Sequence, residues 1–231
     1  LTLGDYYQLP TGRVAALDAN SPFPPISNAL NAPNGLIAIG GDLSSQRLLS
    51  AYTQGIFPWF NEGEPILWWS PNPRMVLFPE NLKISKSLAK RLKKQDYQVK
   101  FNQHFRQVMQ ACASVSRDQQ HGTWISPEMI EAYCELHAQG YACCAETWID
   151  NQLVGGLYGV LINRMFYGES MFHYVTDASK IAFVHMVNYL KQQNVGMIDC
   201  QMNTAHLASL GAKEIDRDLF ISSLQALTQS A

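Results

Sequence analysis

The sequence lacks the features that mark membrane proteins, secreted proteins and zinc proteins. No run of about 18 apolar residues occurs that could span a membrane, and the first residues show neither the basic nor the apolar region of a signal peptide. The six histidines stand in no H-E-x-x-H motif and in no His/Cys spacing suited to zinc. We therefore expect a cytoplasmic protein that contacts no membrane and holds no metal.

Disulfide bonding is not expected either. The five cysteines form no C-x-x-C pair, and their odd number argues against the stapled framework of a small secreted domain. With 231 residues, 47% of them hydrophobic, the chain can instead bury a substantial core in one large domain or two modest ones.

The chain also lacks an excess of charge of one sign. Its net charge of −2 argues against a general nucleic-acid binder, but the charges are unevenly placed. Between Lys83 and Lys100 lie seven lysines and arginines and one acidic residue, Asp96. Such a patch can bind phosphates, although a solvated helix face explains it equally well.

Aromatic residues are concentrated in one segment, from Gly55 to Arg74. It holds three of the five tryptophans, together with four prolines and two glycines. Large rings in a segment that Pro and Gly keep out of long regular structure predict a built surface or pocket. The alternative is that these rings fill a small core.

Helical and strand periodicities divide the chain into two parts. The first 35 residues or so are rich in Pro, Asn and turn signals, and a short helix follows Ser44. Helices are then predicted over 85–94, 105–112, 127–139 and 177–193, and strands over 75–78, 141–149, 152–161, 164–169 and 196–202. Because the last strand follows a crossover helix, we predict an α+β fold, with a small irregular N-terminal domain over residues 1–75 and a mixed-sheet domain over residues 76–231.

Polar side chains interrupt two apolar strands of the second domain. Glu169 follows one strand, and the strand period of two puts Asp199 and Gln201 on one face of the other, with Ile198 and Cys200 on the opposite face. The simplest explanation is a hydrogen-bonded sheet end without chemistry. Covalent catalysis is not favoured, because Cys200 would point away from Asp199 and no serine stands in a G-x-S-x-G turn.

Six short motifs follow one another along the chain: Gly55–Phe60, Trp68–Pro71, Gly122–Ile125, Gly155–Gly159, Gly168–Phe172 and Asp199–Gln201. Their order and spacing closely resemble those of the bacterial leucyl/phenylalanyl-tRNA-protein transferases. The resemblance extends from about Pro33 to Leu227.

The resemblance implies an enzyme that moves Leu or Phe, and Met less well, from aminoacyl-tRNA to the N-terminal Arg or Lys of a protein, marking it for degradation by the N-end rule. It also implies an acetyltransferase-like (GNAT) second domain that uses no acetyl-CoA, so no cofactor is expected. In agreement, no Arg/Gln-x-x-Gly-x-Gly/Ala loop, which would hold a pyrophosphate, follows Glu169. A monomer is expected.

By the family pattern, Glu169, Asp199 and Gln201 form the reaction centre. An aminoacyl ester is already activated, so its conversion to an amide depends mainly on positioning and on stabilising an oxyanion. Because a neutral amide is a very weak base, we expect Gln201 to aim the acceptor amine and Asp199 to fix the orientation of that amide, while a ribose hydroxyl helps to carry the proton. Glu169 is expected to bind the cationic side chain or the amine of the acceptor.

The family pattern also assigns residues to the donor. Trp59 and Trp124 match residues that hold the terminal adenosine, with Tyr52 and Tyr133 as weaker candidates. The apolar positions that match the pocket for the donor side chain are Leu157, Phe166, Phe183, Met186 and Ile198. Taken singly, each of these is better explained as a core residue.

Three lysines of the basic segment, Lys86, Lys93 and Lys94, match positions that contact the tRNA acceptor stem. Contacts of this kind go to the phosphate backbone and carry no base sequence. They strengthen the interpretation of this segment as a tRNA-binding patch.

Two other functions fit part of these observations. One is a peptidoglycan-bridge aminoacyl transferase, which shares the donor and the type of fold but adds residues to a cell-wall precursor. The other is a non-catalytic module that binds RNA or peptides through the aromatic segment.

Overall fold

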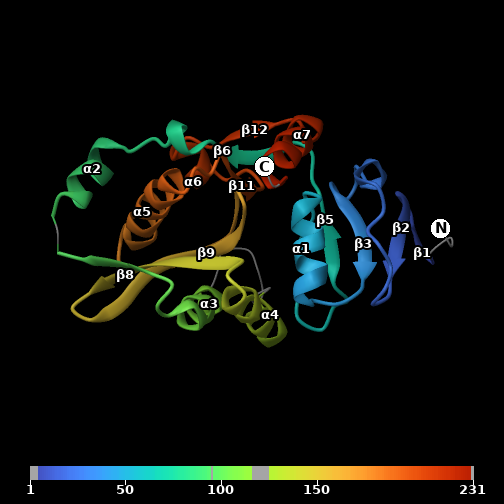
Figure 1. The fold of residues 1–231 in the computed structure, drawn as a ribbon, viewed down its shortest axis with the longest axis horizontal. Helices are drawn as coiled ribbons and strands as arrows, with labels where there is room; N and C mark the ends of the chain where they lie inside the picture. Colours follow the sequence, from blue (N-terminus) through green and yellow to red (C-terminus); the bar gives the residue numbers. More distant parts are fainter. Residues whose placement is uncertain (1–4, 95, 116–124, 230–231) are drawn as a thin grey trace.

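The computed structural model describes residues 5–94, 96–115 and 125–229. It contains a five-stranded sheet near the N-terminus and a seven-stranded sheet formed by the rest of the chain (Figure 1). The larger sheet is mixed and is packed against helices, so the predicted α+β class is confirmed.

The N-terminal part contains more regular structure than predicted. Its strands lie in the order β1–β2–β3–β5–β4, and its elements are β1 (Tyr6–Leu9), β2 (Gly12–Leu17), the short 3-10 helix η1 (Ile26–Asn28), β3 (Leu36–Gly40), α1 (Ser45–Thr53), β4 (Phe57–Pro58) and β5 (Leu67–Trp69). Ser44 caps α1 by accepting a hydrogen bond from the backbone N–H of Arg47, as expected for its position. The turn residues that suggested irregular structure lie mainly after the β1–β2 hairpin, in residues 18–35.

The larger sheet has the strand order β12–β6–β11–β10–β9–β8–β7. Its strands are β6 (Arg74–Leu77), β7 (Gln98–Phe101), β8 (Ala142–Ile149), β9 (Gln152–Ile162), β10 (Met165–His173), β11 (Met197–Gln201) and β12 (Lys213–Ile215). Only one pair of neighbours in this sheet of described strands, β10 and β11, is parallel, and α5 makes the crossover between them, as predicted. The predicted strands at 75–78, 141–149, 152–161 and 196–202 are found within one or two residues at each end.

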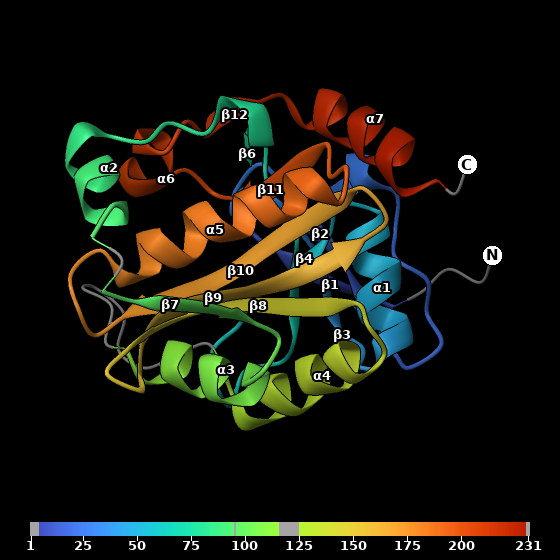
Figure 2. The same cartoon turned by 60° about the vertical axis from the view of Figure 1, so that its left-hand side comes forward.

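Helices pack against both faces of this sheet (Figure 2). The helices of this part are η2 (Pro79–Asn81, 3-10), α2 (Lys86–Leu92), α3 (Phe105–Ser114), α4 (Pro127–Ala138), α5 (Ala178–Gln192), α6 (Ala205–Ser209) and α7 (Arg217–Thr228). α3 and α4 lie on one face and α5 on the other, where its apolar positions Phe183, Met186, Val187 and Leu190 are buried. Within the described ranges, none of the helices is long and apolar enough to cross a membrane.

A single hydrophobic cluster connects the two parts of the chain. Tyr52 and Ile56 from the N-terminal part belong to the same cluster as Val76 and Phe220 from the larger part. The chain passes from one sheet to the other between β5 and β6, close to the expected domain boundary. The division into two domains remains a prediction, because the buried surface is shared. All five cysteines carry free thiols.

Two paired glycines on neighbouring strands provide a test of this packing. A Cβ at Gly159 would lie 2.2 Å from the backbone oxygen of Tyr167 and 2.5 Å from the Phe166 ring, whereas a Cβ at Gly168 would approach nothing closer than 3.5 Å. We expect Gly159→Ala to lower the free energy of unfolding by about 2–3 kcal/mol, since it overpacks the centre of the sheet, and Gly168→Ala to change it by less than about 1 kcal/mol. Denaturant unfolding measures both, and equal losses would contradict this account.

Candidate functional site

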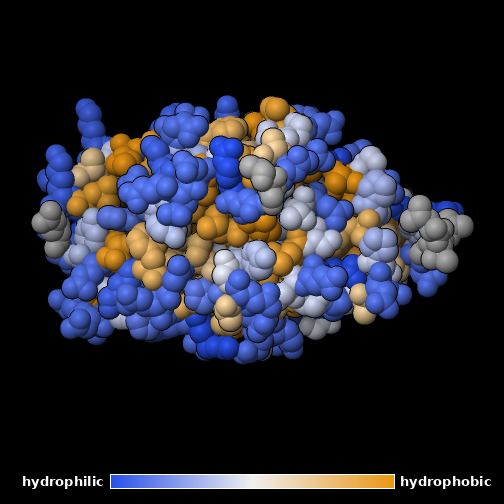
Figure 3. Space-filling view, viewed as in Figure 1, coloured by the Kyte–Doolittle hydropathy of each residue, from blue (hydrophilic) through white to orange (hydrophobic). Residues whose placement is uncertain are grey.

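A pocket opens where the two parallel strands of the large sheet separate. β10 and β11 pair from Met165 to Tyr167 and from Met197 to Asp199, and their pairing ends there. Register shifts follow on both strands, at Glu169 where β10 pairs with β9 and at Cys200 where β11 pairs with β6, and they locally interrupt the regular pairing. The pocket has a volume of about 490 Å³. Apolar side chains gather near the middle of the molecular face drawn in Figure 3.

Glu169 lies at the centre of a buried hydrogen-bond network in this pocket. Its Oε1 accepts hydrogen bonds from the hydroxyl of Tyr52 at 2.7 Å and from the side-chain amide of Gln201 at 3.0 Å. The hydroxyl of Tyr133 donates to Oε2 at 3.5 Å and also contacts the hydroxyl of Tyr52. Four elements, α1, α4, β10 and β11, therefore meet at one carboxyl group.

This environment changes the ionisation of Glu169. Burial raises the pKa of the carboxyl to about 8, and the negative charge of Asp199 acts in the same direction. The hydrogen bonds from Tyr52 and Tyr133 and the positive charge of Arg74 oppose the rise. The group therefore changes between an acid and a base near neutral pH, which is the condition for proton transfer at physiological pH.

Arg74 and Asp199 form a buried ion pair below the network. Nε and Nη2 of Arg74 donate to the two carboxylate oxygens of Asp199, at 2.8 and 2.6 Å, and both side chains are almost fully buried. The guanidinium also donates to the backbone oxygen of Gly55 at 3.1 Å and lies between the rings of Phe57 and Phe220, 4.8 and 4.5 Å from their centroids. Sequence reasoning missed Arg74, although an arginine that begins a strand of otherwise apolar residues indicates a buried partner.

The predicted contact between Asp199 and the side-chain amide of Gln201 is wrong. Asp199 Oδ1 accepts from the backbone N–H of Gln201 at 2.8 Å, and the side-chain amide donates to Glu169 instead. The predicted alternation along this strand also fails, because the bulge and the left-handed backbone of Gln201 (φ 62°) bring Ile198, Cys200 and Gln201 to the pocket together. Asp199 is the residue that remains outside it.

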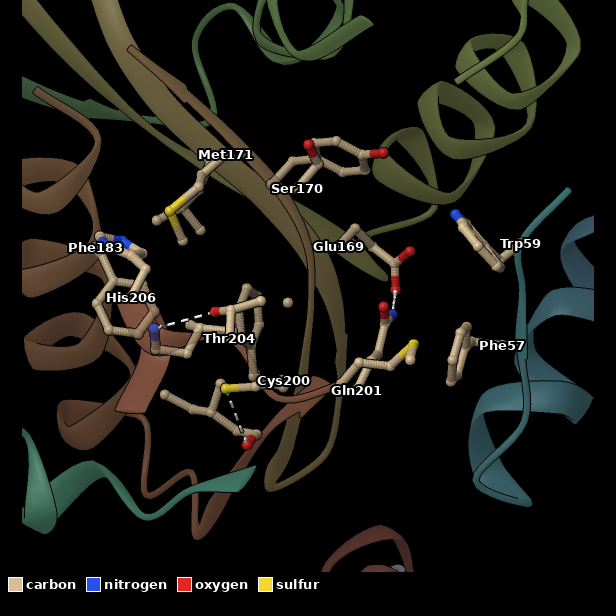
Figure 4. A pocket seen from close by; sticks show the side chains of 17 residues that line it. Phe57, Trp59, Glu169, Ser170, Met171, Phe183, Cys200, Gln201, Thr204 and His206 are labelled. Atoms are coloured by element: carbon tan, nitrogen blue, oxygen red, sulfur yellow. Dashed lines mark hydrogen bonds between the residues drawn. The ribbon is translucent and has the colours of Figure 1, made fainter. Parts of the chain in front are cut away.

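The pocket has an aromatic side and an apolar end. Figure 4 shows Glu169 and Gln201 pointing toward each other, with Phe57 and Trp59 on one side and Met171 on the other. Of the predicted donor residues, Leu157, Phe166, Phe183 and Ile198 line the pocket, but Met186 does not and packs in the core instead. Lining residues that sequence reasoning missed include Phe57, Met171, Met202, Thr204 and His206.

The predicted adenosine-binding rings have different surroundings. Trp59 is 37% exposed and lines the pocket, and Trp69 supports it through an edge-to-face contact at 5.8 Å and a hydrogen bond from its indole N–H to the backbone oxygen of Trp59. Tyr52 and Tyr133 are fully buried and bind Glu169, so the prediction that they stack on a base is wrong. Trp124 lies outside the described residues.

The basic segment is exposed. Lys86 begins α2, and Lys93 and Lys94 follow its end. Their amines are available to an anionic partner, since no ion pair involves them in the described part of the chain. Nowhere in the described part of the chain does a group of His, Cys, Asp and Glu side chains lie together so that it could hold a metal ion.

The comparisons with known proteins agree on one family. The model described as "Leucyl/phenylalanyl-tRNA protein transferase" matches residues 76–225, and the one for the N-terminal domain of the same family matches residues 41–72. A leucyl/phenylalanyl-tRNA–protein transferase of Chromobacterium violaceum is 64% identical over 203 residues, which are 88% of this chain and 87% of that protein. One from Nitrosomonas eutropha is 60% identical, over 93% of this chain and 92% of its own.

Similarity to solved structures is much weaker. A predicted acetyltransferase of Clostridium acetobutylicum has a TM-score of 0.36 and 12% identity, over 48% of this chain and 82% of that one. This similarity is too low to carry an argument, and the GNAT-like arrangement therefore rests on the family resemblance.

The raised pKa of Glu169 predicts a pH-dependent stability. Between its ordinary pKa of 4.5 and about 8, the carboxyl is protonated in the folded protein and ionised in the unfolded chain. The difference in free energy of unfolding between wild type and Glu169→Gln should therefore keep its full value below pH 4.5. It should decrease by up to about 1.4 kcal/mol per pH unit as the pH rises, and level off above pH 8. Denaturant unfolding of both proteins at pH 5 to 9 measures this difference. Parallel curves would show that Glu169 ionises at its ordinary pKa.

Proposed function

The chain belongs to the leucyl/phenylalanyl-tRNA-protein transferase family and is an aminoacyltransferase, and from this premise we propose that it transfers Leu or Phe, and Met less well, from aminoacyl-tRNA to the N-terminal Arg or Lys of acceptor proteins. The observation that supports this best is the meeting of Glu169 and Gln201 beside an apolar pocket. Acceptors modified in this way would enter N-end-rule degradation. We place the reaction in the cytoplasm, where aminoacyl-tRNA is made.

The pocket provides complementary surroundings for the two parts of the donor. We assign its apolar end, with Leu157, Phe166, Phe183 and Ile198, to the donor side chain. A hydrophobic pocket distinguishes Leu, Phe and Met from one another by only about 1–3 kcal/mol, which agrees with a loose preference among them. We assign the exposed ring of Trp59 to the terminal adenine, where stacking contributes about 1–3 kcal/mol.

For the reaction itself we propose that Glu169 accepts the proton of the acceptor amine. An α-amino group has a pKa of about 8, close to that of the Glu169 carboxyl. The free-energy change for proton transfer from the amine to the carboxylate is therefore small. The free amine then attacks the ester carbon and the C–N bond forms. The C–O bond to the ribose breaks while a ribose hydroxyl passes its proton to the leaving oxygen and takes up the proton that the attacking nitrogen releases. Gln201, held by Glu169 and by its backbone contact to Asp199, aims the amine.

This assignment also accounts for a preference for cationic acceptors. A cationic acceptor favours the ionised form of Glu169, and this carboxylate in turn attracts an amino terminus and the Arg or Lys side chain beside it. Because Tyr52 and Tyr133 already hold the carboxyl, its position does not have to be rebuilt when the acceptor arrives.

A transfer assay tests the proposal directly. Labelled Leu on tRNA should be transferred to a peptide that begins with Arg or Lys. Transfer to the same peptide beginning with Ala should be at least tenfold slower, and the Arg peptide with an acetylated amino terminus should not be labelled at all. In the same assay Glu169→Gln should lower kcat by about 10²–10⁴ with little change in donor KM, because it removes the proton acceptor and keeps the shape.

The alternatives predict different products. A peptidoglycan-bridge transferase would modify a cell-wall precursor and leave the Arg peptide unlabelled, and a binding module would modify neither. Either result would reject the proposal.

We also propose that Lys86, Lys93 and Lys94 bind the tRNA backbone. Replacing all three by Gln should reduce the salt dependence of tRNA binding, lowering the slope of log K against log salt by about 2 to 3, because each phosphate contact contributes about 0.7 to 0.9. The matched control is Gln at the exposed residues Arg13, Lys191 and Lys213, which removes the same charge elsewhere. An equal change in both triple variants would show that only the net charge matters.

A further inference from the structure

A second cavity lies beside the start of α5. It has a volume of about 420 Å³, and its lining includes Met171 and His206, which also line the larger pocket. The two cavities therefore adjoin each other. The polar residues of the second cavity come from the end of β10, the start of α5 with the residues before it, and α6: His173, Thr176, Asp177, Ser179, Lys180 and His206.

Two buried polar groups of this cavity lack a hydrogen-bond partner. Ser179 is only 5% exposed, and its hydroxyl makes no hydrogen bond to any residue that the structure describes. Nε2 of His206 is buried as well and has no partner among the same residues. Because buried polar groups are nearly always paired, two unpaired groups in one cavity indicate a ligand that carries hydrogen-bond acceptors.

The first turn of α5 provides further donors to such a ligand. The helix is 15 residues long, and the side chain of its N-cap residue, Asp177, accepts no hydrogen bond from the backbone. The N–H groups of the first turn therefore have no side-chain acceptor, at the end of the helix where its dipole is positive. Asp177 instead accepts from the amine of Lys180 at 3.0 Å, which leaves two of the three ammonium protons for another acceptor.

The charges around the cavity favour an anion. Burial first, and then the positive charges that Lys180 and His173 can carry, lower the pKa of His206, so the three groups lie close to one another. Asp177 is the one carboxylate among the described lining residues, and Lys180 balances its charge. A phosphate group would reduce the repulsion among the cationic groups, and its oxygens would accept hydrogen bonds from both α5 and α6.

We propose that this cavity binds a phosphate group, and that this phosphate belongs to the single-stranded 3′ end of the donor tRNA. The inference rests on the proposed use of aminoacyl-tRNA. The cavity adjoins the pocket assigned to the aminoacyl end, and α2, with the lysines proposed to bind the tRNA backbone, packs against α5. In Figure 2, α2, α6 and the start of α5 lie at the same end of the molecule, so a strand that runs from α2 to the pocket passes the cavity. Free phosphate is the other source of the same chemical group.

Stable donor analogues with and without phosphate test the inference. In both analogues an amide links Leu to the 3′ position of the terminal adenosine. One is the nucleoside alone, which has no phosphate, and the other is the trinucleotide CCA. Replacing Ser179→Ala together with Lys180→Gln should weaken binding of the trinucleotide about tenfold or more, because donors to its phosphate are lost. Binding of the nucleoside should change less than twofold. Titration calorimetry measures both dissociation constants.

The matched control is Lys191→Gln, which removes the same charge from the last turn of α5. An equal loss for both analogues would indicate a purely structural role of Ser179 and Lys180, and an equal effect of the control would show that only net charge matters. Either result overturns the inference.

Inorganic phosphate separates the two sources of the ligand. If the double variant loses binding of inorganic phosphate but binds the trinucleotide as wild type does, the cavity takes free phosphate and its assignment to the tRNA is wrong. If the double variant changes neither, the cavity binds no phosphate. Failure of wild type to bind either analogue would instead reject the proposed function, which is a distinguishable result.

Discussion

The buried ion pair between Arg74 and Asp199 holds together the parts of the chain that build the site. Arg74 begins β6, and Asp199 ends the part of β11 that pairs with β10. The guanidinium also donates to Gly55 and contacts rings from β4 and α7. Moving each of these charges out of water costs several kcal/mol. The attraction between the two charges offsets this cost only when their geometry is good and their remaining hydrogen bonds are made. Here the bidentate pairing, the Gly55 oxygen and the Gln201 N–H meet that condition.

The same pair affects the ionisation of Glu169. The charge of Asp199 raises the pKa of Glu169 and the charge of Arg74 lowers it, so the neutralised pair leaves burial as the main cause of the shift. An unpaired Asp199 would push the Glu169 pKa higher and leave even less of the carboxyl ionised at neutral pH. The ion pair thus permits a buried carboxyl that still loses its proton near pH 8.

Sequence periodicity predicted most of the large sheet and its helices, because α5 and strands β8, β9 and β11 carry regular apolar patterns. It failed where regular structure ends. Tyr52 and Tyr133 were expected to face a ligand, yet their position depends on α1 and α4 meeting at Glu169, which no local pattern encodes. Met186 has the same apolar character as its neighbour Phe183, and only the packing of α5 decides which of the two reaches the pocket.

The bulge at the end of β11 explains why periodicity misplaced the side chains of Asp199 and Gln201. On a regular strand Asp199 and Gln201 would share one face, and both would be either buried or exposed to the pocket. The site needs them apart, since Asp199 must remain buried against Arg74 while Gln201 meets Glu169 in the pocket. One extra residue, Cys200, together with the left-handed backbone of Gln201, separates them while the hydrogen bond from the Gln201 N–H to Asp199 keeps the two in register. Three consecutive residues can therefore serve a buried ion pair, a pocket wall and the proposed reaction centre, because the strand departs from regular geometry between them.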